Sequence, residues 1–172
     1  MVICMNNKKI VISALILFGI GALFHFVYDW IDIKSLAWLF PVNESIFEHT
    51  KLVFLPYTLY YLCLFILRKD KLSSLMYRCN LSIIVATICE VVLYYTISGI
   101  LGSDVPIINM SILYISFVIS LSMDTKVDRN ESHNLACTSM VYLSMLFFVI
   151  VMTYYPFDIA FFYDYNSNKY SI

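Results

Sequence analysis

The sequence predicts an all-α membrane protein: a bundle of about five transmembrane helices with an interfacial or re-entrant segment after the first. The first observation is composition, since 61% of the 172 residues are hydrophobic and 13% are charged. The mean hydropathy of +0.80 is well above that of soluble domains. The second observation is length, because five apolar stretches approach the roughly 20 residues that cross a bilayer. These stretches cover residues 10–30, 46–67, 81–101, 106–123 and 135–155. We expect one integral membrane domain over residues 1–172.

The distribution of basic residues predicts the orientation of the chain. Cytoplasmic loops carry an excess of Lys and Arg. With a cytoplasmic N-terminus, eight basic residues fall on the inner side and three on the outer side, which accounts for all 11. The inner residues are Lys8, Lys9, Arg68, Lys69, Lys71, Arg78, Lys126 and Arg129, and the outer ones are Lys34, Lys51 and Lys169. We therefore expect a multi-pass protein of the plasma membrane with its C-terminus outside.

The first span carries small residues, which let another helix approach closely in lipid. Its apolar run resembles a signal peptide but continues to Val27 without a small-x-small cleavage site, so we interpret it as a retained span. The segment DIKSLAWLF that follows is too short to cross the membrane and ends at Pro41, which indicates an interfacial or re-entrant turn. The small residues are Ser13, Ala14, Gly19, Gly21 and Ala22.

The second and third spans each contain a notable carboxylate. Ser45 precedes the second span and is followed three residues later by Glu48, a capping-box pattern. The loop RKDKLSSLMYR, residues 68–78, is the most basic of the chain, and we expect it to lie against anionic headgroups. The third span, residues 81–101, places Glu90 close to the bilayer midplane, where an ionised group is costly.

The last two spans follow a short external turn. Pro106 begins the fourth span, which offers Asn109, Ser111 and Ser116 as interhelical hydrogen-bonding groups. The fifth span is followed by the aromatic tail DIAFFYDYNSNKYSI, which we expect to fold back along the outer interface.

Polar residues gather between the first two spans, in residues 25–56. At a rise of 1.5 Å per residue, His25 and Lys51 both lie roughly 7 Å inside the outer boundary, and Glu90 lies about 8 to 10 Å deeper. Positions 25 and 29, and likewise 44 and 48, are four residues apart and share a helix face where the chain is helical. The sequence therefore predicts one shared pocket below the outer surface.

The residue types in this cluster suit acid–base or metal chemistry. No spacing matches a zinc signature such as HExxH or paired CxxC motifs. The candidate catalytic residues are His25, Asp29, Glu48, His49, Lys51 and Glu90. The candidate ligands of a divalent metal are His25, Asp29, Glu44, Glu48 and His49.

Four interpretations of the cluster remain open. The first is structural: capping by Ser45 and Glu48, with Glu90 in an ion pair with Lys51 or His25. The second is a protein that binds or conducts a small ligand, proton or cation through Glu90 and His25, which we expect to form a homodimer because five spans are few for a carrier. The third is a membrane-embedded, metal-dependent hydrolase or transferase acting on a lipid-like substrate. The fourth is a structural or regulatory partner of another membrane protein.

Scattered basic residues argue against nucleic acid as a partner, and the lipid bilayer is the expected environment. Four segments, HFVYDW, PVNESIFEHTKLVFLP, YYTISGILG and the terminal FFYDYNSNKYSI, resemble an uncharacterised family of small bacterial membrane proteins. The resemblance covers most of the chain, and the first two segments are the most specific. It implies a multi-span membrane fold and no particular activity, because the family is a domain of unknown function.

Overall fold

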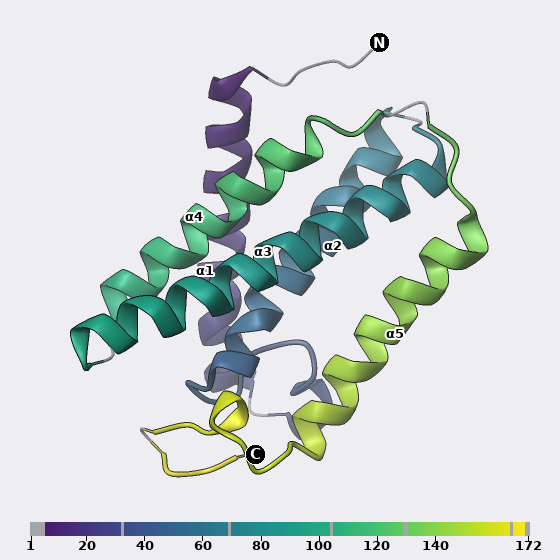
Figure 1. Cartoon of the computed structure of the whole chain (residues 1–172). Helices are drawn as coiled ribbons and strands as arrows, with labels where there is room; N and C mark the ends of the chain where they lie inside the picture. Colours follow the sequence, from purple (N-terminus) through teal and green to yellow (C-terminus); the bar gives the residue numbers. More distant parts are fainter. Residues whose placement is uncertain are drawn as a thin grey trace.

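Five helices, each long and apolar enough to cross a membrane, make up most of the chain that the structure describes. The computed structural model describes residues 6–31, 33–68, 70–103, 105–128, 131–165 and 167–170, without the side chain of Arg68. The helices are α1 (Asn7–Ile31), α2 (Ile46–Arg68), α3 (Leu72–Leu101), α4 (Pro106–Asp124) and α5 (Leu135–Tyr154), with 3₁₀ turns η1 (Lys34–Leu36) and η2 (Ala160–Phe162) (Figure 1). The described residues form helices and no extended strand, so the all-α prediction is confirmed.

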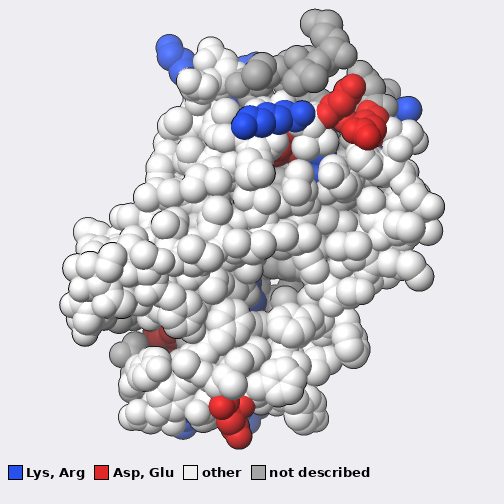
Figure 2. Space-filling model, viewed as in Figure 1, with Lys and Arg blue, Asp and Glu red and all other residues white. Residues whose placement is uncertain are grey.

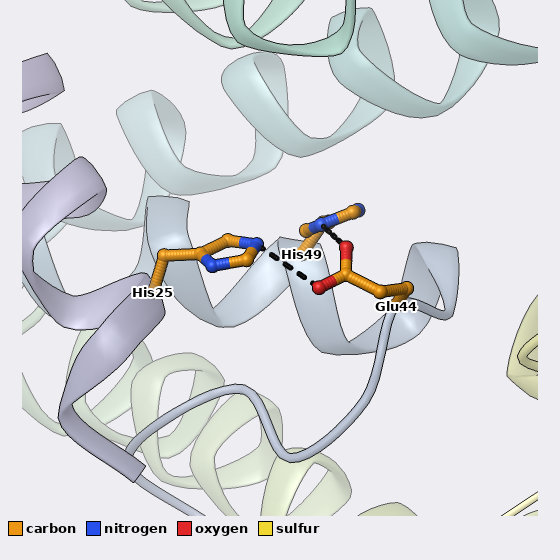
Figure 3. A group of neighbouring side chains, drawn as sticks. All are labelled: His25, Glu44 and His49. Atoms are coloured by element: carbon orange, nitrogen blue, oxygen red, sulfur yellow. Dashed lines mark ion pairs between the residues drawn. The ribbon is translucent and has the colours of Figure 1, made fainter. Parts of the chain in front are cut away.

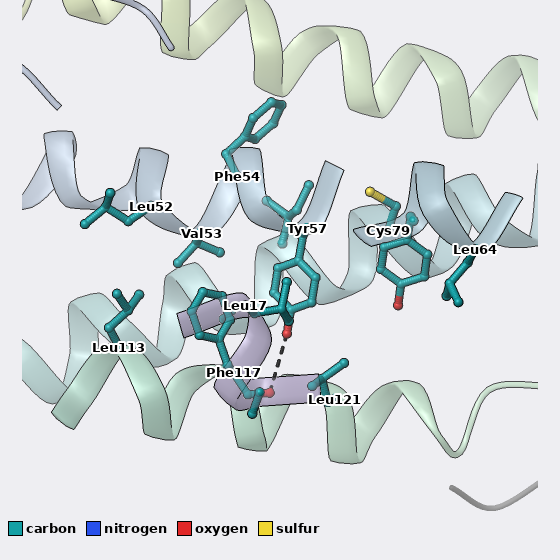
Figure 4. Close-up of a cluster of buried hydrophobic side chains, with 14 of the residues drawn as sticks. Leu17, Leu52, Val53, Phe54, Tyr57, Leu64, Cys79, Leu113, Phe117 and Leu121 are labelled. Carbon is teal, nitrogen blue, oxygen red and sulfur yellow. Dashed lines mark hydrogen bonds between the residues drawn. The ribbon is translucent and has the colours of Figure 1, made fainter. Parts of the chain in front are cut away.

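The first four helices pack around one apolar core. α1 contacts α2 and α4, and α3 contacts α2, α4 and α5. Leu17 of α1, Val53 and Tyr57 of α2 and Phe117 of α4 are fully buried between them (Figure 4). The Tyr57 hydroxyl donates a hydrogen bond to the backbone oxygen of Phe117 at 3.5 Å. This core fixes the relative positions of the helix ends that carry the polar cluster.

The outer surface is apolar between the two ends of the bundle. Figure 2 shows the charged side chains gathered at the two ends of one face, with an almost uncharged belt between them. Large side chains near the middle of three helices are exposed, with Ile16 55%, Ile88 57% and Phe147 68% accessible. Such a broad apolar surface is what a lipid environment requires. The chain is therefore a multi-pass membrane protein.

The start of α3 differs from the sequence prediction. The helix begins at Leu72 and not near residue 81, so residues 72–78 of the predicted loop belong to α3. Arg78 is buried within α3, and its Nε and Nη2 atoms donate to the two carboxylate oxygens of Asp124 at 2.7 and 2.6 Å. This bidentate pair compensates both charges and allows a polar helix turn to enter the bundle.

The ends of the other helices follow the local sequence signals. Pro106 stands at the start of α4, where its missing N–H leaves no bond unmade. The Asn134 side chain accepts hydrogen bonds from the backbone N–H groups of Ala136 and Cys137 and so caps α5. After α5 the chain returns to the start of α2, where Phe162 of η2 packs against Phe47 with ring centroids 4.8 Å apart.

Candidate metal centre

Two histidines and a glutamate meet where α1 ends and α2 begins. His25 lies in the last two turns of α1, and His49 lies in the first turn of α2. α1 and α2 contact each other and run in opposite directions, so these two helix ends lie side by side (Figure 1). Glu44 lies two residues before the start of α2, and the connecting segment brings its carboxylate beside the two imidazoles, with one oxygen toward each (Figure 3).

The three side chains present their ligand atoms to one point. Nε2 of His25 lies 3.5 Å from Oε1 of Glu44, and Nε2 of His49 lies 3.3 Å from Oε2 of the same carboxylate. The two imidazole rings stack with centroids 5.5 Å apart and planes inclined by 27°. One ligand atom from each residue lies within 4.8 Å of the other two. Two imidazoles and one carboxylate form a donor set suited to zinc or another transition metal.

The separations leave room for a shared ion. N–H···O bonds usually measure about 2.7 to 3.2 Å, shorter than both contacts here. Two ligand atoms held about 2.0 to 2.1 Å from a tetrahedral zinc ion stand about 3.3 Å apart. His49 Nε2 lies 3.3 Å from Glu44 Oε2, close to that value, and His25 Nε2 lies 3.5 Å from the other carboxylate oxygen, Oε1.

Glu44 is held in its ionised form. The imidazole N–H groups of His25, followed by those of His49, stabilise the carboxylate and hold its pKa well below the ordinary value of 4.5, although partial burial opposes the shift. Its side chain is 45% exposed, whereas those of His25 and His49 are 21% and 14% exposed. A carboxylate must be deprotonated to bind a metal, and Glu44 meets that condition at neutral pH.

A cavity of about 370 Å³ adjoins the three residues. α1, α2, α3 and α4 all contribute to its wall, and most of the contributing side chains are apolar. Glu90 of α3 also lines it and is only 7% exposed, and its Oε2 atom has no hydrogen-bond partner among the described residues. The described residues that line it are His25, Phe26, Glu44, Ile46, His49, Leu52, Glu90, Tyr94, Pro106, Asn109, Met110, Ile112 and Leu113.

Glu48 and Lys51 belong to a separate, buried arrangement. Lys51 Nζ lies 2.6 Å from Glu48 Oε2 and donates to the backbone oxygen of Ala37 at 2.9 Å. Glu48 Oε2 also accepts a hydrogen bond from the backbone N–H of Val42 at 2.8 Å. Lys51 therefore pairs with Glu48, and not with Glu90 as the structural interpretation of the sequence expected.

The predicted capping box is half formed. Ser45 Oγ accepts a hydrogen bond from the backbone N–H of Glu48 at 3.4 Å, as expected for an N-cap. The Glu48 carboxylate turns to Val42, however, and the N–H of Ser45 is satisfied by the side-chain oxygen of Asn43 at 2.9 Å. These two hydrogen bonds tie the segment between α1 and α2 to the start of α2 and hold Glu44 near the histidines.

The remaining candidates divide between the cavity and the surface. Asp29 is exposed on α1 and stands outside the group of three ligand residues. Tyr94 was not among the sequence candidates, although it follows Glu90 by one helix turn and lines the same cavity. The spacing of four residues from Glu90 was the available signal. Asn109, noted only for interhelical hydrogen bonding, also lines the cavity.

Comparison with known proteins places the chain in a family without providing an activity. No curated protein and no solved structure matches the sequence. A family model described as "Family of unknown function (DUF6512)" matches residues 1–172. The chain therefore belongs to this family of unknown function.

Proposed function

We propose that this membrane protein binds a divalent metal ion, with zinc the best fit, through His25, Glu44 and His49. The observation that carries the proposal is that one ligand atom of each residue lies within 4.8 Å of the others. Imidazole and carboxylate donors suit zinc and other transition metals, whereas calcium and magnesium take oxygen ligands almost exclusively.

The proposed location is the plasma membrane, with the N-terminus in the cytoplasm and the metal site near the external face. The exposed basic residues support this orientation. More of them lie at the end of the bundle that holds the N-terminus, and cytoplasmic segments carry the excess of Lys and Arg. Arg78 and Lys51 are buried in ion pairs and carry no weight in that comparison. Lys69, Arg129 and the side chain of Arg68 lie outside the described residues. Lys8, Lys9, Lys71 and Lys126 belong to the end that holds the N-terminus, and Lys34 and Lys169 belong to the other (Figure 1).

Metal content of the purified protein tests the proposal. The protein is purified without a polyhistidine tag, dialysed against a small excess of zinc, and analysed by mass spectrometry of its elements. We expect one zinc ion per chain. We expect His25→Ala, His49→Ala and Glu44→Gln each to weaken zinc binding by well over tenfold, because each removes one of only three protein ligands.

Matched variants control for nonspecific effects of the same substitutions. His133→Ala removes the third histidine of the chain, which stacks on Tyr77 with ring centroids 3.9 Å apart. Glu131→Gln makes the same change as Glu44→Gln at an exposed loop position. Both should retain one zinc per chain. Protein without bound zinc, or equal zinc content in all five variants, would contradict the proposal.

A further inference from the structure

Glu90 is a buried carboxylate that the metal site alone does not explain. It lies near the middle of the span formed by α3, is 7% exposed and forms no ion pair with a described residue. Its Oε2 atom is buried and lacks a hydrogen-bond partner in the described part of the chain. Ionisable groups within a membrane are costly and usually serve a function. Glu90 lines the same cavity as His25, Glu44 and His49, so we connect the function of Glu90 with that site.

The number of ligands distinguishes a catalytic metal site from a structural one. Structural zinc sites are closed by four protein ligands, whereas catalytic sites have three and leave one position open. The described residues bring together three such groups. A nearby carboxylate that is not a ligand is the usual proton acceptor in metal-assisted hydrolysis. Glu90 is a carboxylate of this kind, because it lines the same cavity as the three ligand residues and is not one of them.

The cavity lining indicates the chemical class of the substrate. Its volume of about 370 Å³ falls within the range of about 300 to 1,000 Å³ found for small-molecule sites. No Lys or Arg is among the described residues that line it, and Lys51 is directed to Glu48 instead. Phosphate groups are usually bound by such cations, so a substrate without a charge near the reacting bond fits better.

The cavity also reaches the surface of the helix bundle. Phe26 lines it and is 48% exposed on α1, and Pro106 on α4 is exposed as well. Leu52, Met110 and Leu113 form further parts of the wall and offer an apolar path for a hydrocarbon chain. A long-chain substrate could therefore enter from the membrane with its polar bond directed toward the metal ligands.

We infer that this cavity hydrolyses an uncharged long-chain acyl ester and that Glu90 is its general base, an inference that rests on the proposed metal site. A metal ion held by His25, Glu44 and His49 would supply Lewis-acid activation of the attacking water and of the ester carbonyl. Glu90 accepts one proton from the water as the water oxygen forms a bond to the acyl carbon. The bond from that carbon to the ester oxygen then breaks, and the proton passes from Glu90 to the leaving alcohol. One ester and one water give one carboxylic acid and one alcohol, without an oxidant or reductant.

The test uses the full-length protein loaded with zinc in detergent micelles. The probes are 4-methylumbelliferyl palmitate, 4-methylumbelliferyl butyrate and monopalmitoylglycerol. We expect hydrolysis that requires zinc and favours palmitate over butyrate. We expect Glu90→Gln to lower kcat by about 100-fold or more, the usual contribution of a general base, while it retains one zinc per chain. Glu131→Gln makes the same chemical change at an exposed position and should leave kcat unchanged.

A second variant keeps the inference testable if Glu90→Gln does not fold. Met110→Trp narrows the cavity and changes no charged group, so it should reduce palmitate hydrolysis more than butyrate hydrolysis with zinc content unchanged. Zinc-loaded wild-type protein that hydrolyses none of the three probes would overturn the inference and leave the metal site intact. Full activity in Glu90→Gln would overturn the role of Glu90. Protein that binds no zinc would instead overturn the proposed function.

Discussion

Gly21 of α1 lies directly against the backbone of Leu52 in α2. A Cβ atom at position 21 would stand 3.2 Å from the carbonyl oxygen of Leu52 and 3.7 Å from Cδ2 of Leu113. Pro56 lies one turn after Leu52 inside α2 and has no N–H, so the Leu52 carbonyl lacks its usual helical donor. The absence of a side chain on Gly21 allows α1 to approach that carbonyl closely.

This close approach positions two of the three candidate ligands. His25 follows Gly21 by four residues on α1, and His49 precedes Leu52 by three residues on α2. Both spacings place the histidine on the helix face that carries the contact. The separation of the helices at Gly21 therefore controls the distance between the stacked imidazoles.

Substitution of Gly21 should separate the helices and weaken the metal site. We expect Gly21→Leu to lower the free energy of unfolding by about 1 to 3 kcal/mol, as overpacking usually does. Zinc affinity should fall at the same time. Gly19→Leu is the matched control, because nothing lies within 4 Å of a Cβ atom at that position. Equal effects of the two substitutions on thermal unfolding in detergent would show that the contact is not important.

Removal of Lys51 should destabilise the protein strongly. Its side chain is 1% exposed and that of Glu48 is 3% exposed, so Lys51→Met leaves a buried carboxylate without its counter-ion. Breaking a buried ion pair in this way costs about 3 to 5 kcal/mol. The double substitution Lys51→Met and Glu48→Gln should recover part of the loss, because no unpaired charge remains. Chemical unfolding in detergent measures the effect, with exposed Lys126→Met as the control.

Arg78 and Lys71 should respond differently to the same substitution. Arg78→Met leaves the buried Asp124 unpaired and should lower the free energy of unfolding by about 3 to 5 kcal/mol. Lys71 is exposed at the start of α3, so Lys71→Met should change the free energy of unfolding by no more than about 0.5 kcal/mol. If segment 68–78 acted only as a surface anchor, the two variants would unfold at similar denaturant concentrations.

Acid should remove the stabilising contribution of Glu44. The folded protein holds the pKa of Glu44 below its ordinary value of 4.5, because the imidazoles of His25 and His49 stabilise the carboxylate. A lowered pKa stabilises the folded state fully above the unfolded pKa, and this contribution declines as the pH falls below about 4.5. The Tm advantage of wild type over Glu44→Gln should therefore shrink between pH 6 and pH 3.5. An advantage that stays constant over this interval would contradict the assignment.

The sequence was sufficient for the number of helices and for most of their ends. Apolar runs of membrane length and signals such as Pro106 are local, so they survive in any tertiary context. The start of α3 was missed because Arg78 and Asn80 lower the hydropathy of its first turns. Their compensation comes from distant residues, Asp124 for Arg78 and the backbone oxygen of Thr138 for Asn80. Pairs so far apart in the chain leave no trace in a single sequence.

The candidate site was only partly accessible from sequence. His25, Glu44 and His49 are candidate ligands because they lie in one short stretch of the sequence. The meeting of their ligand atoms, however, depends on the fold. Lys51 was assigned to the same pocket from its depth alone, but its direction on α2 leads to Glu48 and Ala37. The depth of a residue in the membrane follows from the helical rise, whereas the direction in which its side chain points depends on how the helices pack.

X-ray absorption spectroscopy at the zinc edge tests the central claim most directly, because it identifies the atoms bound to the ion. Coordination by His25, Glu44 and His49 predicts nitrogen and oxygen neighbours at about 2.0 to 2.2 Å, with the outer-shell scattering of two imidazoles. Loss of one imidazole is expected in His49→Ala. Sulfur neighbours at about 2.3 Å would place the metal on cysteines instead and contradict the account.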